Sequence, residues 1–149
     1  MRAAVFALTD GGAALAARLC AALDGEAQLY LPERLNGSTP TAGHTAYFAH
    51  LSAAMTTAFS RYDALVCVMA TGIVVRTLAP CVRSKLYDPA VIVFDEQGRH
   101  GISLLSGHVG GANDLTRTLC AAVGADPVVT TATDVTGVLA PDAVAARLA

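Results

Sequence analysis

With 149 residues, 54% of them hydrophobic and 15% charged, the chain has the composition of a folded domain with a sizeable core. The low charge argues against a disordered chain, and a net charge of −2 without any basic run argues against nucleic-acid binding. The apolar stretches are shorter than the roughly 20 residues that a membrane-spanning helix needs, so no membrane span is expected.

Apolar periodicity in the first half predicts strands that alternate with helices. The expected elements are a strand at 2–8, an alanine-rich helix at 13–23, a strand at 27–31, a loop at 32–43, a helix at 45–59 and a strand at 64–69. The loop is expected because Pro, Asn, Gly, Ser and Thr are concentrated there. The run at 64–69 is apolar throughout, which is typical of a strand buried on both faces.

The second half continues the alternation and adds one hairpin. The expected elements are a short helix at 73–79, a polar connection at 83–88, a strand at 90–94, a turn at 96–99, a strand at 100–105, a helix at 112–123, a strand at 127–129 and a helix from about 141. The turn residues at 96–99 predict that strand 100–105 returns antiparallel to strand 90–94.

This order of elements predicts an α/β fold. We expect a mostly parallel sheet with one antiparallel hairpin and helices on both faces, in three α/β/α layers. The chain is expected to form one region over 1–149, with a division into 1–60 and 61–149 as the alternative.

The chain has four widely spaced cysteines: Cys20, Cys67, Cys81 and Cys120. We interpret them as free, mostly buried thiols in a reducing cytoplasm. No cysteine or histidine pair has the spacing of a metal site, so no bound metal is expected. His44, His50 and His100 are accordingly interpreted as surface or loop residues.

Small polar residues follow four of the predicted strands. These exits are Thr9 to Gly12, Thr71 with Gly72, Ser106 to His108, and Thr130 to Asp134. Ligands of open α/β sheets bind outside the carboxyl ends of the strands, so we expect the four exits to share one rim. Their hydroxyl and backbone N–H groups would supply donors for a carboxylate or a developing oxyanion.

The exit at Ser106 to His108 is the most informative of the four. A helix begins shortly afterwards, past Gly110 and Gly111, near Asn113. The first N–H groups of a helix lack intrahelical partners and lie at the positive end of its dipole, so this junction is a candidate anion site. His108 adds an imidazole that can move a proton near neutral pH.

Each of these features also has a purely structural interpretation. Thr9, Asp10 and Asp134 have the residue types of helix N-caps, and Thr71 with Gly72 has the pattern of a tight turn. Gly110 and Gly111 would also allow a helix to pack closely on the sheet.

Three cations, Arg76, Arg83 and Lys85, precede the pair Asp88 and Pro89. They indicate either a solvated surface or a positive lip that receives an anionic ligand. The glycine-rich fingerprints of dinucleotide and nucleotide sites do not occur, nor does the nucleophile elbow of α/β-hydrolases.

Four segments between residues 70 and 137 closely resemble the amino-terminal region of the cobalamin-biosynthesis family CbiG. They are Ala70 to Arg76, Lys85 with Asp88 to Val91, Ser103 to His108 with Gly110 to Asn113, and Thr131 to Asp134. Members of that family usually continue into a middle and a carboxy-terminal domain. The resemblance therefore implies that this chain corresponds to an amino-terminal part, from which the carboxy-terminal domain is absent.

The resemblance also implies cobalt-precorrin-5A hydrolase activity in anaerobic cobalamin (vitamin B12) biosynthesis. In that reaction a δ-lactone on an anionic tetrapyrrole opens and a two-carbon bridge leaves as acetaldehyde. The cobalt is carried by the substrate, so no cofactor is expected. The expected partners are the tetrapyrrole and the carboxy-terminal domain or other corrin-pathway enzymes, with neither nucleic acid nor membrane among them.

On this interpretation His108 positions or deprotonates the attacking water. The expected substrate-binding residues are Thr71, Gly72, Arg76, Ser106, Gly107, Gly110, Gly111, Asn113, Thr131, Thr133 and Asp134. N–H groups near Thr71 with Gly72 and near Gly110 with Gly111 would stabilise the oxyanion. Two alternatives stay open: a non-catalytic corrin-binding or docking module, and an unrelated α/β domain that binds a phosphorylated small molecule.

Overall fold

A computed structural model describes residues 1–37 and 45–132. Seven strands form a single sheet in the order β3-β2-β1-β4-β5-β6-β7. The strands are β1 (Arg2–Ala7), β2 (Glu26–Pro32), β3 (Thr45–Phe48), β4 (Ala64–Val68), β5 (Ala90–Phe94), β6 (His100–Leu105) and β7 (Asp126–Val128). The α/β class with a mostly parallel sheet and one antiparallel pair is confirmed.

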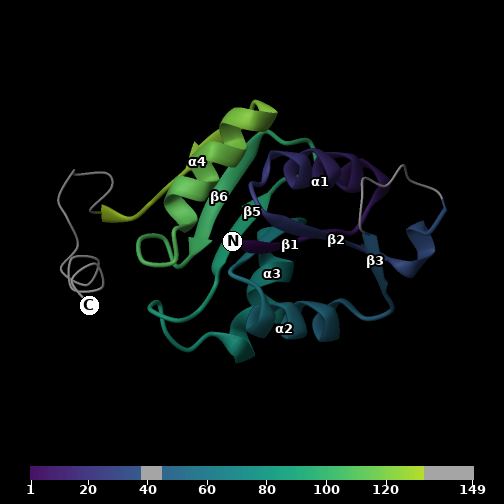
Figure 1. Ribbon diagram of the computed structural model, residues 1–149, viewed down its shortest axis with the longest axis horizontal. Coiled ribbons are helices and arrows are strands. Elements are labelled where there is room, and N and C mark those ends of the chain that lie inside the picture. The colour runs from purple at the N-terminus through teal and green to yellow at the C-terminus, as the bar shows by residue number, and fades with distance from the viewer. Residues whose placement is uncertain (38–44, 133–149) are drawn as a thin grey trace.

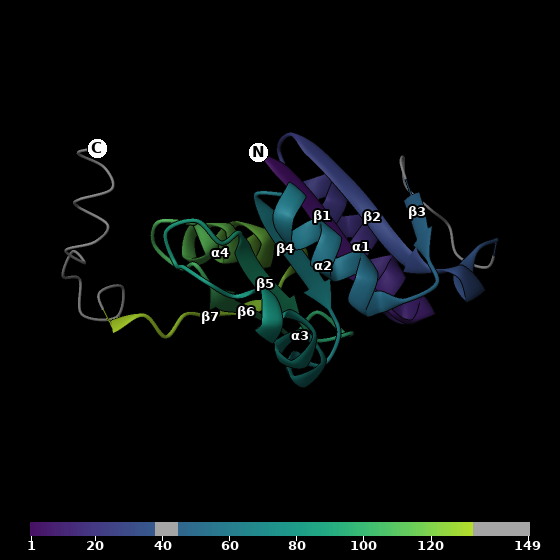
Figure 2. The ribbon, with the colours of Figure 1, turned by 90° about the horizontal axis from the view of Figure 1, so that it is seen from below.

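Four α-helices cover the sheet in two layers: α1 (Asp10–Ala22), α2 (Leu51–Arg61), α3 (Thr71–Leu78) and α4 (Ala112–Val123). Figure 1 shows α1 and α4 above the sheet and α2 and α3 below it, and Figure 2 shows the same layers from below. The predicted three layers are therefore present. Short 3-10 turns follow β2 (Glu33–Leu35) and α3 (Ala79–Cys81).

Alternation along β1 explains how one strand serves two cores. Ala3, Val5 and Ala7 face the α1 and α4 layer, whereas Ala4 and Phe6 face the α2 and α3 layer. All five residues are buried, as are all residues of β4 and β5. Strands buried on both faces read as continuous apolar runs, which is why the sequence predicts them well.

One element differs from the prediction. The segment predicted as a helix at 45–59 begins with the four-residue strand β3 before α2 starts at Leu51. Thr45 to Phe48 pair in parallel with Leu29 to Pro32 of β2. A strand this short depends on pairing with a segment distant in the sequence, which local periodicity does not reveal. The predicted final helix from about 141 lies outside the described residues.

The hairpin decides where the strand exits lie. β5 and β6 pair antiparallel, and β7 pairs parallel to β6. The carboxyl ends of β6 and β7 therefore open at the end of the sheet where β1, β4 and β5 begin. We call this end the His108 rim, and we call the opposite end, where β1, β4 and β5 finish, the switch-point rim.

Candidate functional site

The expectation that four strand exits share one rim is wrong. Ser106 to His108 and Thr131 follow β6 and β7 at the His108 rim, whereas Thr9 and the pair Thr71 and Gly72 follow β1 and β4 at the switch-point rim. Strands of five residues separate the two rims by about 17 Å. The physical reason is the hairpin, because it reverses β6 and the strand that later pairs with β6.

At the His108 rim, a tightly built loop joins β6 to α4. Ser106 has a φ of 59°, in the left-handed region that L-residues adopt only at a cost. Its Oγ donates to the Asp88 carbonyl at 3.0 Å, which ties the loop to the segment before β5. A Cβ on Gly110 would lie 2.4 Å from the Ser106 Cβ, so only glycine fits there.

The side chain of Asn113 supports the same loop through hydrogen bonds. The side chain is 2% exposed, and its Oδ1 accepts a hydrogen bond from Ser103 Oγ at 2.6 Å while its Nδ2 donates to Thr131 Oγ1 at 3.1 Å. A Cβ on Gly107 would lie 2.7 Å from that Oδ1. Asn113 and Thr131, both expected to bind substrate, are thus placed to fix the loop, and His108 lies half-buried within it.

The expected anion site at the start of α4 is occupied by the protein itself. The N–H groups of Ala112 and Asn113 donate to the carbonyls of Ser106 and Gly107, at 3.1 and 3.0 Å, and the Gly111 N–H donates to the His108 carbonyl at 3.2 Å. Within the described ranges, the N–H groups of Val109 and Gly110 make no hydrogen bond. These two amides are available donors of the loop.

The predicted positive residues lie in two places. Arg83 and Lys85 are exposed in the loop that leads to β5, where the Asp88 carboxylate accepts hydrogen bonds from the N–H groups of Arg83 and Ser84 at 2.8 and 2.9 Å. The Asp88 carboxylate is thereby directed at its own loop. Arg76 is exposed on α3, with its guanidinium folded back toward Gly72. The expected lip therefore consists of Arg83 and Lys85 at the His108 rim.

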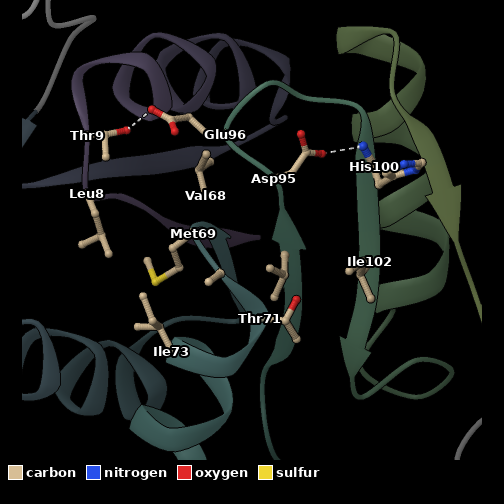
Figure 3. A pocket seen from close by; sticks show the side chains of 12 residues that line it. Leu8, Thr9, Val68, Met69, Thr71, Ile73, Asp95, Glu96, His100 and Ile102 are labelled. Carbon is tan, nitrogen blue, oxygen red and sulfur yellow. Dashed lines mark hydrogen bonds between the residues drawn. The ribbon is translucent and has the colours of Figure 1, made fainter.

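At the switch-point rim, a crevice of about 490 Å³ opens between the ends of β1, β4 and β5. Strand order reverses between β1 and β4, which is where open α/β sheets bind ligands. Figure 3 shows Leu8, Met69 and Ile73 along one side, Ile102 opposite, and Thr9 joined to Glu96. Two carboxylates, Asp95 and Glu96, line this crevice together with His100, and no Lys or Arg of the described residues is among its lining residues.

The sequence does not reveal this acidic crevice, because residues 96–99 have only the pattern of a hairpin turn. Thr9 Oγ1 donates to Glu96 Oε1 at 2.5 Å and accepts the N–H of Gly12 at 3.0 Å, so Thr9 is an N-cap as the alternative interpretation held. Asp95 accepts the N–H groups of Gln97 and His100 at 3.2 and 2.7 Å. The crevice depends on β1, β4 and β5 being neighbours in the sheet, and the pattern of a single strand does not predict that order.

Glu96 also bears on the phosphate-binding alternative. Its carboxylate lies at the start of α1, where a Cβ on Gly11 would come within 2.8 Å of Oε1. An anion is therefore already at the positive end of this helix. Since the first N–H groups of α4 are likewise bonded, neither of these helix starts offers an open phosphate site, and the alternative loses its support.

Within residues 1–37 and 45–132, no three His, Cys, Asp or Glu side chains gather closely enough to hold a metal ion. In the same residues, no helix combines the length and the apolarity that crossing a bilayer requires. All four cysteines are free, as predicted, and burial raises the pKa of Cys20 to about 11 and that of Cys67 to about 12.

Comparison with known proteins decides the family. Residues 53–134, more than half of the chain, match the family described as "Cobalamin synthesis G N-terminal". This chain belongs to the cobalamin synthesis G N-terminal family. The resemblance inferred from the sequence is therefore confirmed.

Two relatives of this family member are named cobalt-precorrin-5A hydrolase. One, from Salmonella typhimurium, is 51% identical over 145 residues, which are 97% of this chain and 40% of that protein. The other, from Priestia megaterium, is 37% identical over 132 residues, which are 89% of this chain and 35% of that protein. The chain thus spans well under half the length of each relative.

A solved structure of a cobalamin biosynthesis protein G homolog from Sulfolobus solfataricus shares the fold of this family member. The TM-score is 0.63 at 24% identity, over 86% of this chain and 36% of that one. The family match itself includes the exits on both rims, from Thr71 to Thr131. Thr133 and Asp134 lie outside the described residues, as does His44, whereas His50 and His100 are exposed as expected.

Proposed function

We propose that this chain forms the amino-terminal part of a cobalt-precorrin-5A hydrolase, which opens the δ-lactone of a cobalt tetrapyrrole and releases acetaldehyde. The observation that carries the proposal is 51% identity, over 97% of this chain, to the Salmonella typhimurium protein of that name. The family match over residues 53–134 supports it independently. The four free thiols suit a reducing compartment, and we assign the reaction to the cytoplasm.

The chemistry requires a proton acceptor and a place for negative charge. Water adds to the lactone carbonyl and the ring C–O bond breaks, leaving a carboxylic acid and a hydroxyl. The hydroxyl then loses its proton, its carbon becomes the aldehyde carbon of acetaldehyde, and the electron pair of the broken C–C bond stays on the macrocycle. Both the water and the hydroxyl have to give up a proton, which an imidazole accepts readily near neutral pH.

We assign the proton transfers to His108. Its loop is fixed by the left-handed backbone of Ser106, by the close contact of Gly110 with Ser106 and by the buried Asn113. The loop that carries the imidazole therefore does not have to reorganise during the reaction. The N–H groups of Val109 and Gly110 are the proposed donors to the oxyanion of the lactone carbonyl. This replaces the donors near Gly72 and Gly111, because the first lies at the other rim and the second is already bonded.

The test uses a chimera in which this chain replaces the matching 40% of the Salmonella typhimurium protein. We expect the chimera to release acetaldehyde from cobalt-precorrin-5A, and His108→Ala or His108→Gln to lower the turnover number about a hundredfold, the usual contribution of a positioned acid or base. His50→Gln is the matched control, since His50 is exposed at the start of α2 with no side-chain capping bond.

The same experiment separates the two functional alternatives. Turnover close to that of the unsubstituted chimera in both His108 variants would place the chemistry in the remainder of the protein. The chain would then act as the corrin-binding or docking module. A chimera that folds and releases no acetaldehyde would remove the hydrolase proposal itself.

A further inference from the structure

An apolar groove runs between α3 and β6. It has a volume of about 390 Å³, and all seven lining residues are apolar: Val74, Val75, Leu78, Ala79, Val82, Leu104 and Leu105. Two leucines of β6, Leu104 and Leu105, stay half-buried on this face of the sheet beside α3. The described part of the chain leaves this surface without a covering element.

Exposed apolar side chains lie in the groove and in the loop that follows it. Val75 is 49% exposed and Val82 44% exposed, and in the next loop Leu86 and Tyr87 are 45% and 87% exposed. These four are two thirds of the six large hydrophobic side chains exposed in the described residues. Exposed apolar side chains beside an apolar groove are typical of an interaction site in a folded protein.

The groove opens at the His108 rim. Leu104 and Leu105 directly precede Ser106, and the loop that carries Arg83 and Lys85 is bonded to that serine through the Asp88 carbonyl. An apolar surface, two exposed cations and the His108 loop therefore adjoin one another. The Asp88 carboxylate accepts hydrogen bonds from the N–H groups of Arg83 and Ser84, which turn it toward its own loop.

We propose that this groove receives the apolar face of the tetrapyrrole macrocycle, with the macrocycle's acetate and propionate groups toward Arg83 and Lys85 and one edge at His108. The proposal rests on the proposed function and locates its substrate on this chain. Its basis is charge complementarity together with continuity between the groove and the His108 loop. A carboxylated macrocycle needs both features at once: a broad apolar surface and cations at its margin.

Two other cavities among the described residues suit this ligand less well. The crevice at the switch-point rim is lined by Asp95 and Glu96, which repel carboxylates. A cavity of about 460 Å³ between α2 and β2 contains Arg2 and Arg61 among aromatic side chains. There, however, the Arg2 guanidinium already contacts Glu26 at 3.6 Å and the Tyr62 ring at 5.1 Å. This cavity also lies near the β3 edge of the sheet, several strands away from β6.

The test measures binding of cobyrinic acid, a cobalt corrin with free carboxylate side chains, to this chain by equilibrium dialysis. We expect Val75→Glu to weaken binding about tenfold or more, because it places a carboxylate in the groove beside those of the ligand. Arg83→Ala is expected to weaken binding about threefold and to reduce its dependence on salt. Cobyric acid, whose side chains are mostly amides, should bind more weakly and with less salt dependence than cobyrinic acid.

Ala53→Glu on α2 is the matched control, since Ala53 is also an exposed apolar helix position and lines the aromatic cavity. We expect it to leave binding unchanged. Because Val75 lies in a helix, Val82→Glu provides a second groove variant outside any α-helix. Urea midpoints within experimental error of the unsubstituted chain establish that each variant is folded.

Several results would overturn the groove assignment. Unchanged corrin affinity in both folded groove variants would do so, as would loss of affinity in Ala53→Glu or a change of sedimentation mass on Val75→Glu without a change in corrin binding. An unsubstituted chain that binds neither corrin would also overturn it. Acetaldehyde release by the chimera is a separate measurement, so the proposed function can stand where the groove fails.

Discussion

Gly110 and Gly11 both lie close to a neighbouring residue, but the cost of adding a Cβ depends on whether that neighbour can move. A Cβ on Gly110 would lie 2.4 Å from the Ser106 Cβ and 2.8 Å from its carbonyl oxygen, and the backbone there is already strained. We predict that Gly110→Ala lowers the free energy of unfolding by about 1–3 kcal/mol, the usual cost of forcing a packed segment to move. Urea unfolding of the variant and the unsubstituted chain measures this.

Gly11→Ala is the informative comparison. Its Cβ would also come within 3 Å of a neighbour, but that neighbour is the carboxylate end of Glu96, an exposed and flexible side chain. The carboxylate can move aside, and alanine favours the helix, so stability should stay within about 1 kcal/mol of the unsubstituted chain. Equal losses in both variants would show that the His108 loop is not specially constrained.

A buried thiol gives a pH-dependent prediction. Burial raises the pKa of Cys67 to about 12, so the folded state keeps the thiol protonated at pH values where the unfolded chain ionises it. Its contribution to stability is therefore complete below the unfolded-state pKa, near 9, and is lost as pH rises toward 12. We predict that Cys67→Ala is less stable at neutral pH, by about 1 kcal/mol, and loses less stability between neutral pH and about pH 10.

Urea midpoints of the two proteins at both pH values measure this difference. Parallel losses in Cys67→Ala and the unsubstituted chain would contradict the assignment. Cys20, whose pKa burial raises to about 11, is unchanged in both proteins and cancels in the comparison.

At the scale of elements, the sequence predicts those that depend on local pattern. The range of α4 and those of β5 and β6 agree with prediction, because a 3.6-residue period and continuous apolar runs are local signals. β3 was missed since its four residues are stabilised by β2 rather than by their own pattern. The catalytic histidine candidate could be found because a glycine-rich strand exit is also a local feature.

The relation between elements was harder to predict than the elements. The hairpin at 90–105 was predicted, yet its consequence for the exits requires knowing that β7 pairs with the reversed strand. That pairing joins residues 100–102 to residues 126–128, with α4 in between. The groove could not be predicted from the sequence either, because Val75, Val82 and Leu104 come together only when α3 has packed on the sheet.

At the scale of the whole molecule, the sheet separates two sets of polar loops by the length of its central strands. Thr71 lines the switch-point crevice, whereas His108 and its supporting residues lie at the other end. A lactone carbonyl that contacts His108 is therefore out of reach of the Thr71 hydroxyl. Although the sequence suggests both residues as substrate ligands, the fold predicts that their substitutions have unequal effects.

We predict that Thr71→Val in the chimera keeps kcat/KM within about twofold of the unsubstituted chimera, whereas His108→Gln lowers it about a hundredfold. Valine has nearly the shape of threonine, so the substitution removes the hydroxyl and little else. Steady-state acetaldehyde release measures both variants under the same conditions. A large loss in Thr71→Val with little change in His108→Gln would move the reaction to the acidic crevice, where Asp95, Glu96 and His100 line the cavity as proton acceptors.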